Sequence, residues 1–391
     1  MTTPPQDGSR AEAAKVAGLA IVLTGGGARG AYQVGVLRGI ARHLPELRFP
    51  IITGTSAGAI NAIYLAAHPG SPREAAEDLC QVWSKLEFSD VFRVDSWALA
   101  RSTMGWFSRL GLGAGSASST PGLLDTEPLR QMMRRELGTQ NEIPGIERNI
   151  AAGWLDAVAL MTVKYATGQT LSWVQGRDIV TWERPARRSL ETELTVEHVM
   201  ASAALPFMFP AVELEGEWFG DGGIRMAAPL SPALHLGATR ILAVSNQYPR
   251  SQKEADRPTS KGYPGPAKIA GNLLNAIFLD VLDQDVQRLQ RLNRLLRKLP
   301  PEEREGMRPV DILVMRPSED LGRLSAQYEP RLPKGFRFLT RNLGTRETDS
   351  PDSLSLLMFQ GDYMQHLIEV GERDAENQID AIRELAHGCK I

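Results

Sequence analysis

A serine in the first quarter of the chain has the surroundings that a catalytic nucleophile requires. Ser56 lies in the sequence GTSAG, from Gly54 to Gly58, between an apolar run and a segment of small and apolar residues. At a tight turn between a strand and a helix a serine exposes its hydroxyl, and flanking glycines permit the strained backbone. The G-x-S-x-G pattern therefore predicts a nucleophile elbow, although a serine that only caps the helix also fits it.

An aspartate much later in the chain is the candidate base, because a serine hydroxyl becomes a good nucleophile only when a neighbouring group accepts its proton. Asp221 follows the bulky Trp218 and Phe219 and precedes Gly222 and Gly223. Burial beside apolar side chains raises the pKa of a carboxylate and makes it a stronger base. Taken alone, the D-G-G pattern also fits an ordinary hairpin turn.

The histidines are weaker candidates for this base. The order of an α/β-hydrolase triad is available as Ser56, Asp221 and either His235 or His366, but that fold places several strands before its nucleophile. Only 55 residues precede Ser56. None of the histidines lies in a glycine-rich loop, so we expect all six on the surface or in helices: His43, His68, His198, His235, His366 and His387.

A glycine-rich loop precedes the serine and follows the apolar run 19–23. Its sequence GGGARG places Gly25, Gly27 and Gly30 in the spacing G-x-G-x-x-G, which is typical of dinucleotide-binding loops. We expect Gly25 and Gly30 to permit the turn and the close packing of this loop. Main-chain N–H groups in such a loop stabilise either a bound phosphate or an oxyanion that forms during a reaction.

The residues that follow favour the oxyanion. A dinucleotide-binding unit carries an acidic residue near the end of its second strand, which holds the ribose. Here the second expected strand runs directly into the serine turn, and the acidic candidate Glu46 precedes that strand. We therefore expect the N–H groups around Gly26, Gly27 and Ala28 to be the donors of an oxyanion hole.

The elements that must position these residues alternate along the chain between strand-like apolar runs and helical segments. This alternation predicts an α/β fold with a central, mostly parallel sheet between helices. The expected strands are 17–25, 50–54, 156–166, 240–247 and 310–317. The clearest expected helices, 30–44 and 58–67, each begin directly after a glycine-containing turn.

Changes in composition divide the chain into four parts. We expect a polar leader over 1–16, a catalytic domain over 17–247, a linker or loop over 248–267, and a mostly helical extension over 268–391 that packs on the catalytic domain. Within the second part, the aromatic segment 85–122 fits either a lid over an apolar site or a surface insertion. One or two helices are expected near the carboxyl end.

The extension begins with a long amphipathic segment, 268–299, whose second half is basic. A helix of this kind packs an apolar stripe against a sheet, or lies on anionic lipid. We favour packing, with the basic residues toward the negative end of the helix. These residues are Arg288, Arg291, Arg294, Arg297 and Lys298.

The composition of the chain indicates which kinds of partner and which cellular compartment to expect. The 44 basic and 46 acidic residues give a net charge of −2, which indicates no nucleic-acid partner. Cys80 and Cys389 lie far apart, so neither a disulfide framework nor a zinc site is indicated. No signal peptide and no apolar run of the ~18 residues that a membrane span needs are found, and we expect a cytoplasmic protein. Export without a signal peptide stays open.

Four motifs together carry a family resemblance. GGGARG, GTSAG, ASAALPFMFPAV and DGG, in this order, resemble the patatin-like phospholipase family over about residues 17–247. Segments 270–293 and 352–375 are also similar to the C-terminal portions of bacterial members. The resemblance implies a largely parallel sheet between helices and a Ser-Asp dyad that uses no histidine.

The resemblance assigns roles residue by residue. Ser56 becomes the acylated nucleophile, Asp221 the general base, and the loop from Gly25 to Gly30 the oxyanion hole. Arg29 matches the family's basic position in that loop, whereas a solvated arginine at a helix start is the alternative. Thr24 departs from the family pattern, since many members have serine or aspartate there.

The resulting hypothesis is a serine acyl hydrolase that cleaves lipid esters, of the phospholipase A or lysophospholipase type. This chemistry requires no metal and no cofactor. The expected partner of the protein is its lipid or lysophospholipid substrate, and a peripheral contact with a membrane stays open. A transacylase that passes the same acyl group to another acceptor stays open, and a dinucleotide-binding protein or an inactive scaffold is less favoured. The head group, acyl position, chain length and oligomeric state are not defined by the sequence.

Overall fold

A computed structural model describes residues 18–93, 124–206, 208–256, 281–332 and 352–388. Several expected segments lie outside this part of the chain. They are the leader 1–16, residues 94–122 of the aromatic segment, residues 257–267 of the linker, and residues 268–280 of the long helix.

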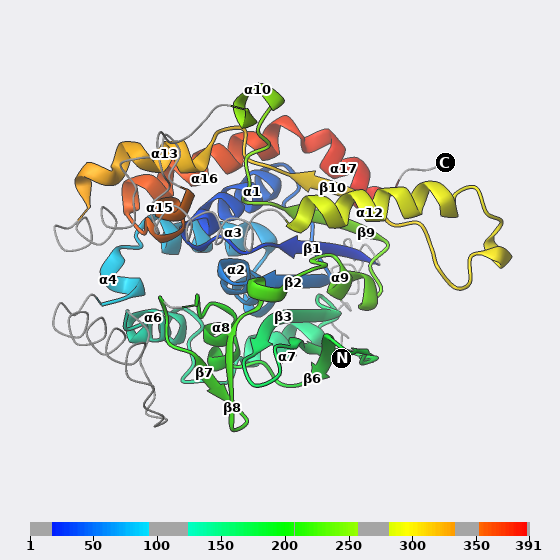
Figure 1. Ribbon diagram of the computed structural model, residues 1–391, viewed down its shortest axis with the longest axis horizontal. Helices are drawn as coiled ribbons and strands as arrows, with labels where there is room; N and C mark the ends of the chain where they lie inside the picture. The colour runs from blue at the N-terminus through cyan, green and yellow to red at the C-terminus, as the bar shows by residue number, and fades with distance from the viewer. Residues whose placement is uncertain (1–17, 94–123, 207, 257–280, 333–351, 389–391) are drawn as a thin grey trace, which may run out of the picture.

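Five parallel strands form the centre of a mixed sheet and run in the order β10-β9-β1-β2-β3 (Figure 1). All five were expected from the sequence, and the structure confirms each within a few residues. They read as nearly continuous apolar runs because helices cover both faces of the sheet. Their bounds are β1 Leu19–Leu23, β2 Ile51–Thr55, β3 Ala157–Lys164, β9 Arg240–Val244 and β10 Asp311–Met315.

An antiparallel part extends the sheet beyond β3. The strand β4 (Thr170–Gly176) pairs antiparallel with β3 and parallel with β6 (Arg187–Glu191), which pairs with β5 (Glu183–Arg184). The strand β8 (Glu217–Asp221) pairs antiparallel with the end of β3 and with β7 (Val212–Leu214). These strands are very short or contain several polar residues, so no clear strand pattern marks them in the sequence.

Alternate side chains of the central strands face two hydrophobic layers. On one face, Ile21 and Leu23 of β1 pack with α1 (Gly30–His43), α2 (Ala57–Ala67), α3 (Pro72–Ser84) and α16 (Gly361–Asn377). On the other face, Ala20 and Val22 pack with α9 (Ser231–His235) and α12 (Val281–Leu296). The remaining described α-helices are α4 Phe88–Val91, α6 Glu127–Glu136, α7 Pro144–Ala151, α8 Val196–Ser202, α10 Gln252–Ala255, α13 Leu321–Tyr328, α15 Asp352–Leu357 and α17 Ile379–His387.

The basic helix α12 packs against the sheet, as favoured from its sequence. Its apolar stripe, which includes Leu282, Val286 and Leu289, is buried in the same layer as β1 and β9. The buried Asn293 anchors it further, since its side chain donates to the carbonyl of Val310 at 2.7 Å and accepts from the N–H of Val310 at 3.0 Å.

The C-terminal chain shares its core with the rest of the molecule. The strand β10 forms one edge of the sheet, and α15, α16 and α17 follow where one or two helices were expected. The helices α16 and α1 approach so closely that a Cβ on Gly35 would lie 2.0 Å from the carbonyl oxygen of Ile368. Glycine at this position therefore sets the distance between the two helices.

The close approach of α1 and α16 predicts that Gly35→Ala is destabilising. Alanine favours a helix by about 1 kcal/mol, but its methyl group meets the backbone of α16 and forces the helices apart. We expect the free energy of unfolding to fall by at least ~2 kcal/mol in urea denaturation. Gln365→Ala on the exposed side of α16 is the control and should have little effect. A neutral or stabilising effect of Gly35→Ala would contradict this packing.

Candidate active site

Ser56 occupies the turn between β2 and α2 that the sequence predicted. Its backbone has φ 58° and ψ −129°, a conformation that non-glycine residues rarely adopt. The turn is tight: a Cβ on Gly58 would lie 2.2 Å from the carbonyl oxygen of Leu23, so only glycine fits there. Gly54 lies directly beneath the same turn. Strain of this kind marks candidate functional sites, and the simple helix-cap interpretation is not supported because the Ser56 side chain makes no capping hydrogen bond.

The glycine loop lies beside Ser56 because β1 and β2 are parallel neighbours and end at the same edge of the sheet. A Cβ on Gly25 would be 3.1 Å from the Cβ of Ser56. The loop continues into a short 3₁₀ helix, Gly27–Arg29, and then into α1 at Gly30. The first N–H groups of a helix have no partner within it, so those of Gly27 and Ala28 are suited to donate to a negatively charged oxygen.

Two amide side chains hold this loop from behind. The Asn246 side chain, just after β9, donates to the carbonyl of Gly25 at 2.9 Å and to that of Thr24 at 3.3 Å. The Gln33 side chain donates to the same Thr24 carbonyl at 2.7 Å. Because a trans peptide directs its C=O and N–H to opposite sides, the bond to Gly25 turns the N–H of Gly26 away from Asn246. No sequence motif identified Asn246 or Gln33.

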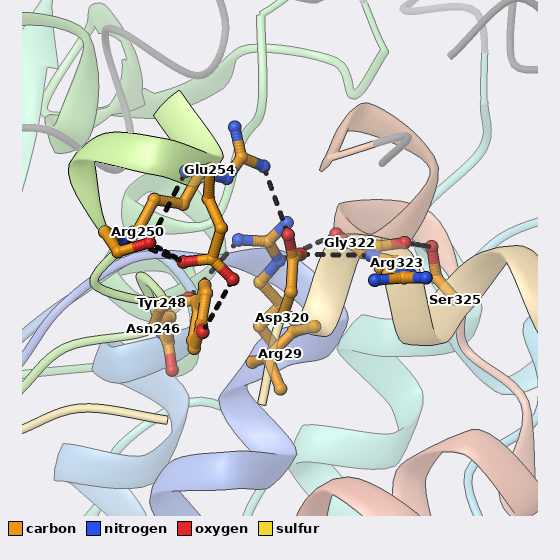
Figure 2. Close-up of polar contacts among 12 residues, drawn as sticks. Arg29, Asn246, Tyr248, Arg250, Glu254, Asp320, Gly322, Arg323 and Ser325 are labelled. Atoms are coloured by element: carbon orange, nitrogen blue, oxygen red, sulfur yellow. Dashed lines mark hydrogen bonds and ion pairs between the residues drawn. The ribbon is translucent and has the colours of Figure 1, made fainter. Parts of the chain in front are cut away.

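Arg29 is buried rather than solvated, which corrects the alternative interpretation of this residue. Only 2% of its surface is exposed. Its Nε donates to the Ser355 hydroxyl at 2.7 Å, and an Nη atom donates to the carbonyl of Asn246 at 3.3 Å. Figure 2 shows Arg29 and Asn246 together with the nearby ion pair of Arg250 and Asp320, 3.4 Å apart. Arg29 therefore anchors the glycine loop to other parts of the chain.

Asp221 ends β8 and is fully buried. The pairing of β8 with β3 places it opposite Thr162, and its Oδ1 accepts from the N–H of Gly223 at 2.8 Å. Gly222 packs against the backbone of β3. The D-G-G motif thus forms the start of a 3₁₀ helix after the strand.

Burial raises the pKa of the Asp221 carboxyl from 3.8 to about 7. Hydrogen bonding from the Ser56 hydroxyl and from the N–H of Gly223 acts in the opposite direction and lowers this pKa. Ser56 is therefore within reach of Asp221, although Asp221 Oδ2 has no well-aligned donor among the described residues. A carboxyl with a pKa near neutrality is suited to take up and return a proton.

A short segment after α8 holds both residues by their backbones. The Ser202 hydroxyl accepts from the N–H of Ser56 at 3.1 Å and donates to the carbonyl of Met161 at 2.7 Å. Two residues later, the carbonyl of Ala204 accepts from the N–H of Asp221 at 3.1 Å. Ser202 and Ala204 belong to the ASAALPFMFPAV motif, which contributed to the family resemblance but to which the sequence analysis assigned no chemical role.

None of the hydrogen bonds and ion pairs of the histidines in the described part of the chain involves Ser56 or Asp221. His235 stacks on Trp182 with ring centroids 4.6 Å apart, and His366 lies 3.1 Å from the Tyr328 hydroxyl. The contacts of the other histidines are as follows: His198 with Thr195, His68 with Asp78 and His43 with Glu376, while His387 is exposed in α17. His198 is buried, and burial lowers its pKa to about 4. Glu46 is exposed and precedes β2.

An apolar pocket opens next to Ser56. It is lined by Gly26, Gly27 and Ser56 and by residues of α2, α3, α6, 203–209 and the C-terminal segment. Among the described lining residues the only charged one is Glu136. From the expected lid, Leu86 and Val91 line this pocket, and residues 94–122 lie outside the described chain. The pocket is suited to an acyl chain that places its carbonyl at the serine.

The fold and this site define an α/β protein with a serine in a strained strand-to-helix turn beside a glycine loop. A family model described as patatin-like phospholipase matches residues 21–234, which is more than half of the chain, and the protein belongs to this family. The resemblance seen in the motifs is therefore confirmed.

Similar solved structures include human GIVD cytosolic phospholipase A2, at 11% identity and a TM-score of 0.47, with 94% of this chain and 60% of that chain covered. VipD from Legionella pneumophila is similar at 13% identity and a TM-score of 0.34, with 76% of this chain and 60% of that chain covered. The chain thus spans about three fifths of the length of these proteins. No curated protein matches this sequence.

Two kinds of feature are missing from the described part of the chain. None of its helices combines the length and the apolar character needed to cross a membrane. Within the same residues, no three His, Cys, Asp or Glu side chains are grouped so that they could hold a metal ion.

The contact between Ser202 and Ser56 predicts that Ser202→Ala impairs the ester hydrolysis that we propose below. The substitution leaves the buried N–H of Ser56 without its acceptor, which costs about 1–3 kcal/mol and relaxes the strained turn. We expect kcat to fall about ten-fold or more. Ser325→Ala is the matched control, since Ser325 is equally buried but donates within α13 to Gly322. Unchanged kcat in Ser202→Ala would contradict this role.

The raised pKa of Asp221 predicts a pH-dependent effect on stability. Because the pKa is about 7 in the folded state and 3.8 as the ordinary value, the folded state holds a proton that the unfolded chain has released between these values. Its stabilising contribution is complete below about pH 4 and is lost as the pH rises through 7. Relative to Asp221→Asn, the wild type should therefore lose stability in urea unfolding from pH 5 to pH 8. If the free energies of unfolding of the two proteins change with pH in parallel, the pKa of Asp221 is not raised in the folded state.

Proposed function

We propose that the protein is a serine acyl hydrolase that cleaves lipid esters through Ser56 and Asp221, as a phospholipase A or lysophospholipase. The observation that carries the proposal is a buried carboxyl, with its pKa raised to about 7, next to a serine held at φ 58°. A base poised near neutral pH and a serine that lines a pocket are what a two-residue mechanism needs. Family membership supports the same class of reaction.

In the first step, Ser56 Oγ attacks the carbonyl carbon of the ester while Asp221 accepts the hydroxyl proton. The carbonyl oxygen becomes negatively charged and is stabilised by the N–H groups of Gly26, Gly27 and Ala28. When the bond to the leaving oxygen breaks, Asp221 gives its proton to that oxygen, and the alcohol departs. The product is an acyl ester on Ser56 with Asp221 ionised again.

In the second step, water attacks the acyl ester and gives a proton to Asp221. The tetrahedral intermediate collapses, the proton returns to Ser56 Oγ, and the fatty acid is released. The buried position of Asp221 serves both steps, because the same desolvation that makes the carboxylate a stronger base leaves the protonated acid able to donate.

The pocket argues for an acyl chain as the part of the substrate that is recognised. Its lining includes Ile60, Val82, Leu129 and Met133, which offer apolar contact and few hydrogen bonds. The ester carbonyl would lie between Ser56 and the glycine loop, with the chain along these side chains and the alcohol portion directed outward. A lipid ester fits this division better than a small polar ester.

The proposed dyad predicts that Ser56→Ala and Asp221→Asn each lower kcat for lipid ester hydrolysis by about 10³-fold or more. A panel of phospholipids, lysophospholipids and acylglycerols, assayed for released fatty acid, measures the activity and the substrate class together. A fluorophosphonate probe should label wild type at Ser56, as located by peptide mass spectrometry.

Matched controls separate chemistry from folding. Ser325→Ala removes an equally buried hydroxyl, and Asp285→Asn changes another partly buried carboxyl that accepts a backbone N–H, from Leu230 at 2.9 Å. Both controls should retain activity. Full activity of Ser56→Ala or Asp221→Asn would refute the dyad. Formation of a new ester in the presence of an added alcohol would instead indicate acyl transfer from the same intermediate.

A further inference from the structure

The C-terminal segment 352–359, made of α15 and the two residues after it, lies outside the region 21–234 that the family model matches. It nevertheless touches the glycine loop. Gly27 has φ 53°, and a Cβ there would lie 2.1 Å from the carbonyl oxygen of Leu356. The backbones of α15 and of the loop are therefore in direct contact, and Figure 1 shows α15 beyond the carboxyl end of β1.

A buried charged hydrogen bond reinforces this contact. Arg29 ends the 3₁₀ helix of the loop, and its Nε donates to the Ser355 hydroxyl at 2.7 Å. Ser355 is fully buried and Arg29 nearly so. Hydrogen bonds from a charged donor are strong, and a buried position strengthens them further. The bond thus fixes the position of Arg29. This residue lies two positions after Gly27, which supplies the first N–H group of the 3₁₀ helix.

The same segment forms one wall of the apolar pocket. Leu356, Leu357 and Phe359 line it together with Ser56 and Gly27. The ring of Phe359 packs edge-on against Phe92, with centroids 6.1 Å apart, which ties the wall to the segment after α4. Residues outside the family-matched region therefore line the same pocket as the candidate nucleophile.

We propose that segment 352–359 completes the active site in two ways, a proposal that rests on the function proposed above. Ser355 is a positioning residue that sets the oxyanion loop through Arg29. Leu356, Leu357 and Phe359 determine which acyl chains the pocket accepts. Oxyanion donors act only when they are held within a fraction of an ångström of their working position, so a support behind the loop affects the chemical step.

The positioning role is tested with Ser355→Ala and Ser355→Thr. Loss of the hydroxyl should lower kcat about ten-fold on a short-chain ester and leave KM within two-fold, while threonine, which keeps the hydroxyl, should restore most of kcat. A role in folding alone would not separate kcat from KM. The rate of fluorophosphonate labelling at Ser56 should fall in parallel with kcat. Equal kcat in wild type and Ser355→Ala, or no rescue by threonine, overturns this part.

The wall is tested with Leu357→Ala against Leu354→Ala. Leu354 is a matched control because it lies in the same helix and is equally apolar and buried, but does not line the pocket. On p-nitrophenyl esters, the ratio of kcat/KM for a twelve-carbon chain to that for a four-carbon chain should fall about five-fold in Leu357→Ala, because long chains lose an apolar contact. The ratio should not change in Leu354→Ala. A similar change in both variants, or in neither, contradicts the proposal that this wall determines which acyl chains the pocket accepts.

Fatty acid binding keeps this test independent of catalysis. cis-Parinaric acid, a fluorescent eighteen-carbon fatty acid, should bind Leu357→Ala with a Kd about three-fold higher than it binds wild type or Leu354→Ala. An unchanged Kd in Leu357→Ala contradicts the proposal that the wall binds the acyl chain. If wild type binds this probe but hydrolyses no ester on the lipid panel, the proposed function is wrong. The contribution of the wall to fatty acid binding is then still measured by the Kd values. If wild type hydrolyses esters and the variants behave alike, only the inference on segment 352–359 fails.

Discussion

Much of this structure follows from keeping one carboxyl, that of Asp221, buried beside Ser56. Removal from water raises the pKa of this group to about 7, and the protein compensates with few hydrogen bonds, chiefly that of the Gly223 N–H. A group in this position must be held by its backbone, because its side chain has little to hold it. The pairing of β8 with β3 and the carbonyl of Ala204 provide that support.

The same edge of the sheet gathers the other parts of the site. Parallel pairing of β1 with β2 brings the glycine loop against the serine turn, and β9 brings Asn246 behind the loop. Rigid strands make the spacing reproducible, whereas the loops between them supply the free N–H groups. The C-terminal chain adds to this arrangement through β10 at the edge of the sheet and α15 against the loop. In our proposal it thereby contributes to the chemistry.

The central fold was predictable because strands buried on both faces are written as continuous apolar runs. The strands β1, β2, β3, β9 and β10 were expected for this reason, and the helices α1 and α2 from their spacing and their glycine turns. The strands β4 to β8 were missed because some are very short, such as β5 and β7, whereas β4 interrupts its apolar residues with Thr170, Ser172 and Gln175. Helix α12 was correctly expected to pack on the sheet, since its apolar stripe is matched to that surface.

The sequence by itself determined the local chemistry: a serine between glycines, a glycine loop after a strand, and an aspartate beside apolar bulk, because each depends on neighbouring residues in the chain. Only the tertiary structure decided which residues hold these groups in place. Ser202 on the N–H of Ser56, Asn246 on the loop, and Ser355 on a buried Arg29 are separated from their partners by 146, 221 and 326 positions. Contacts over such separations leave no local pattern, since they exist only when the sheet brings the ends of its strands together.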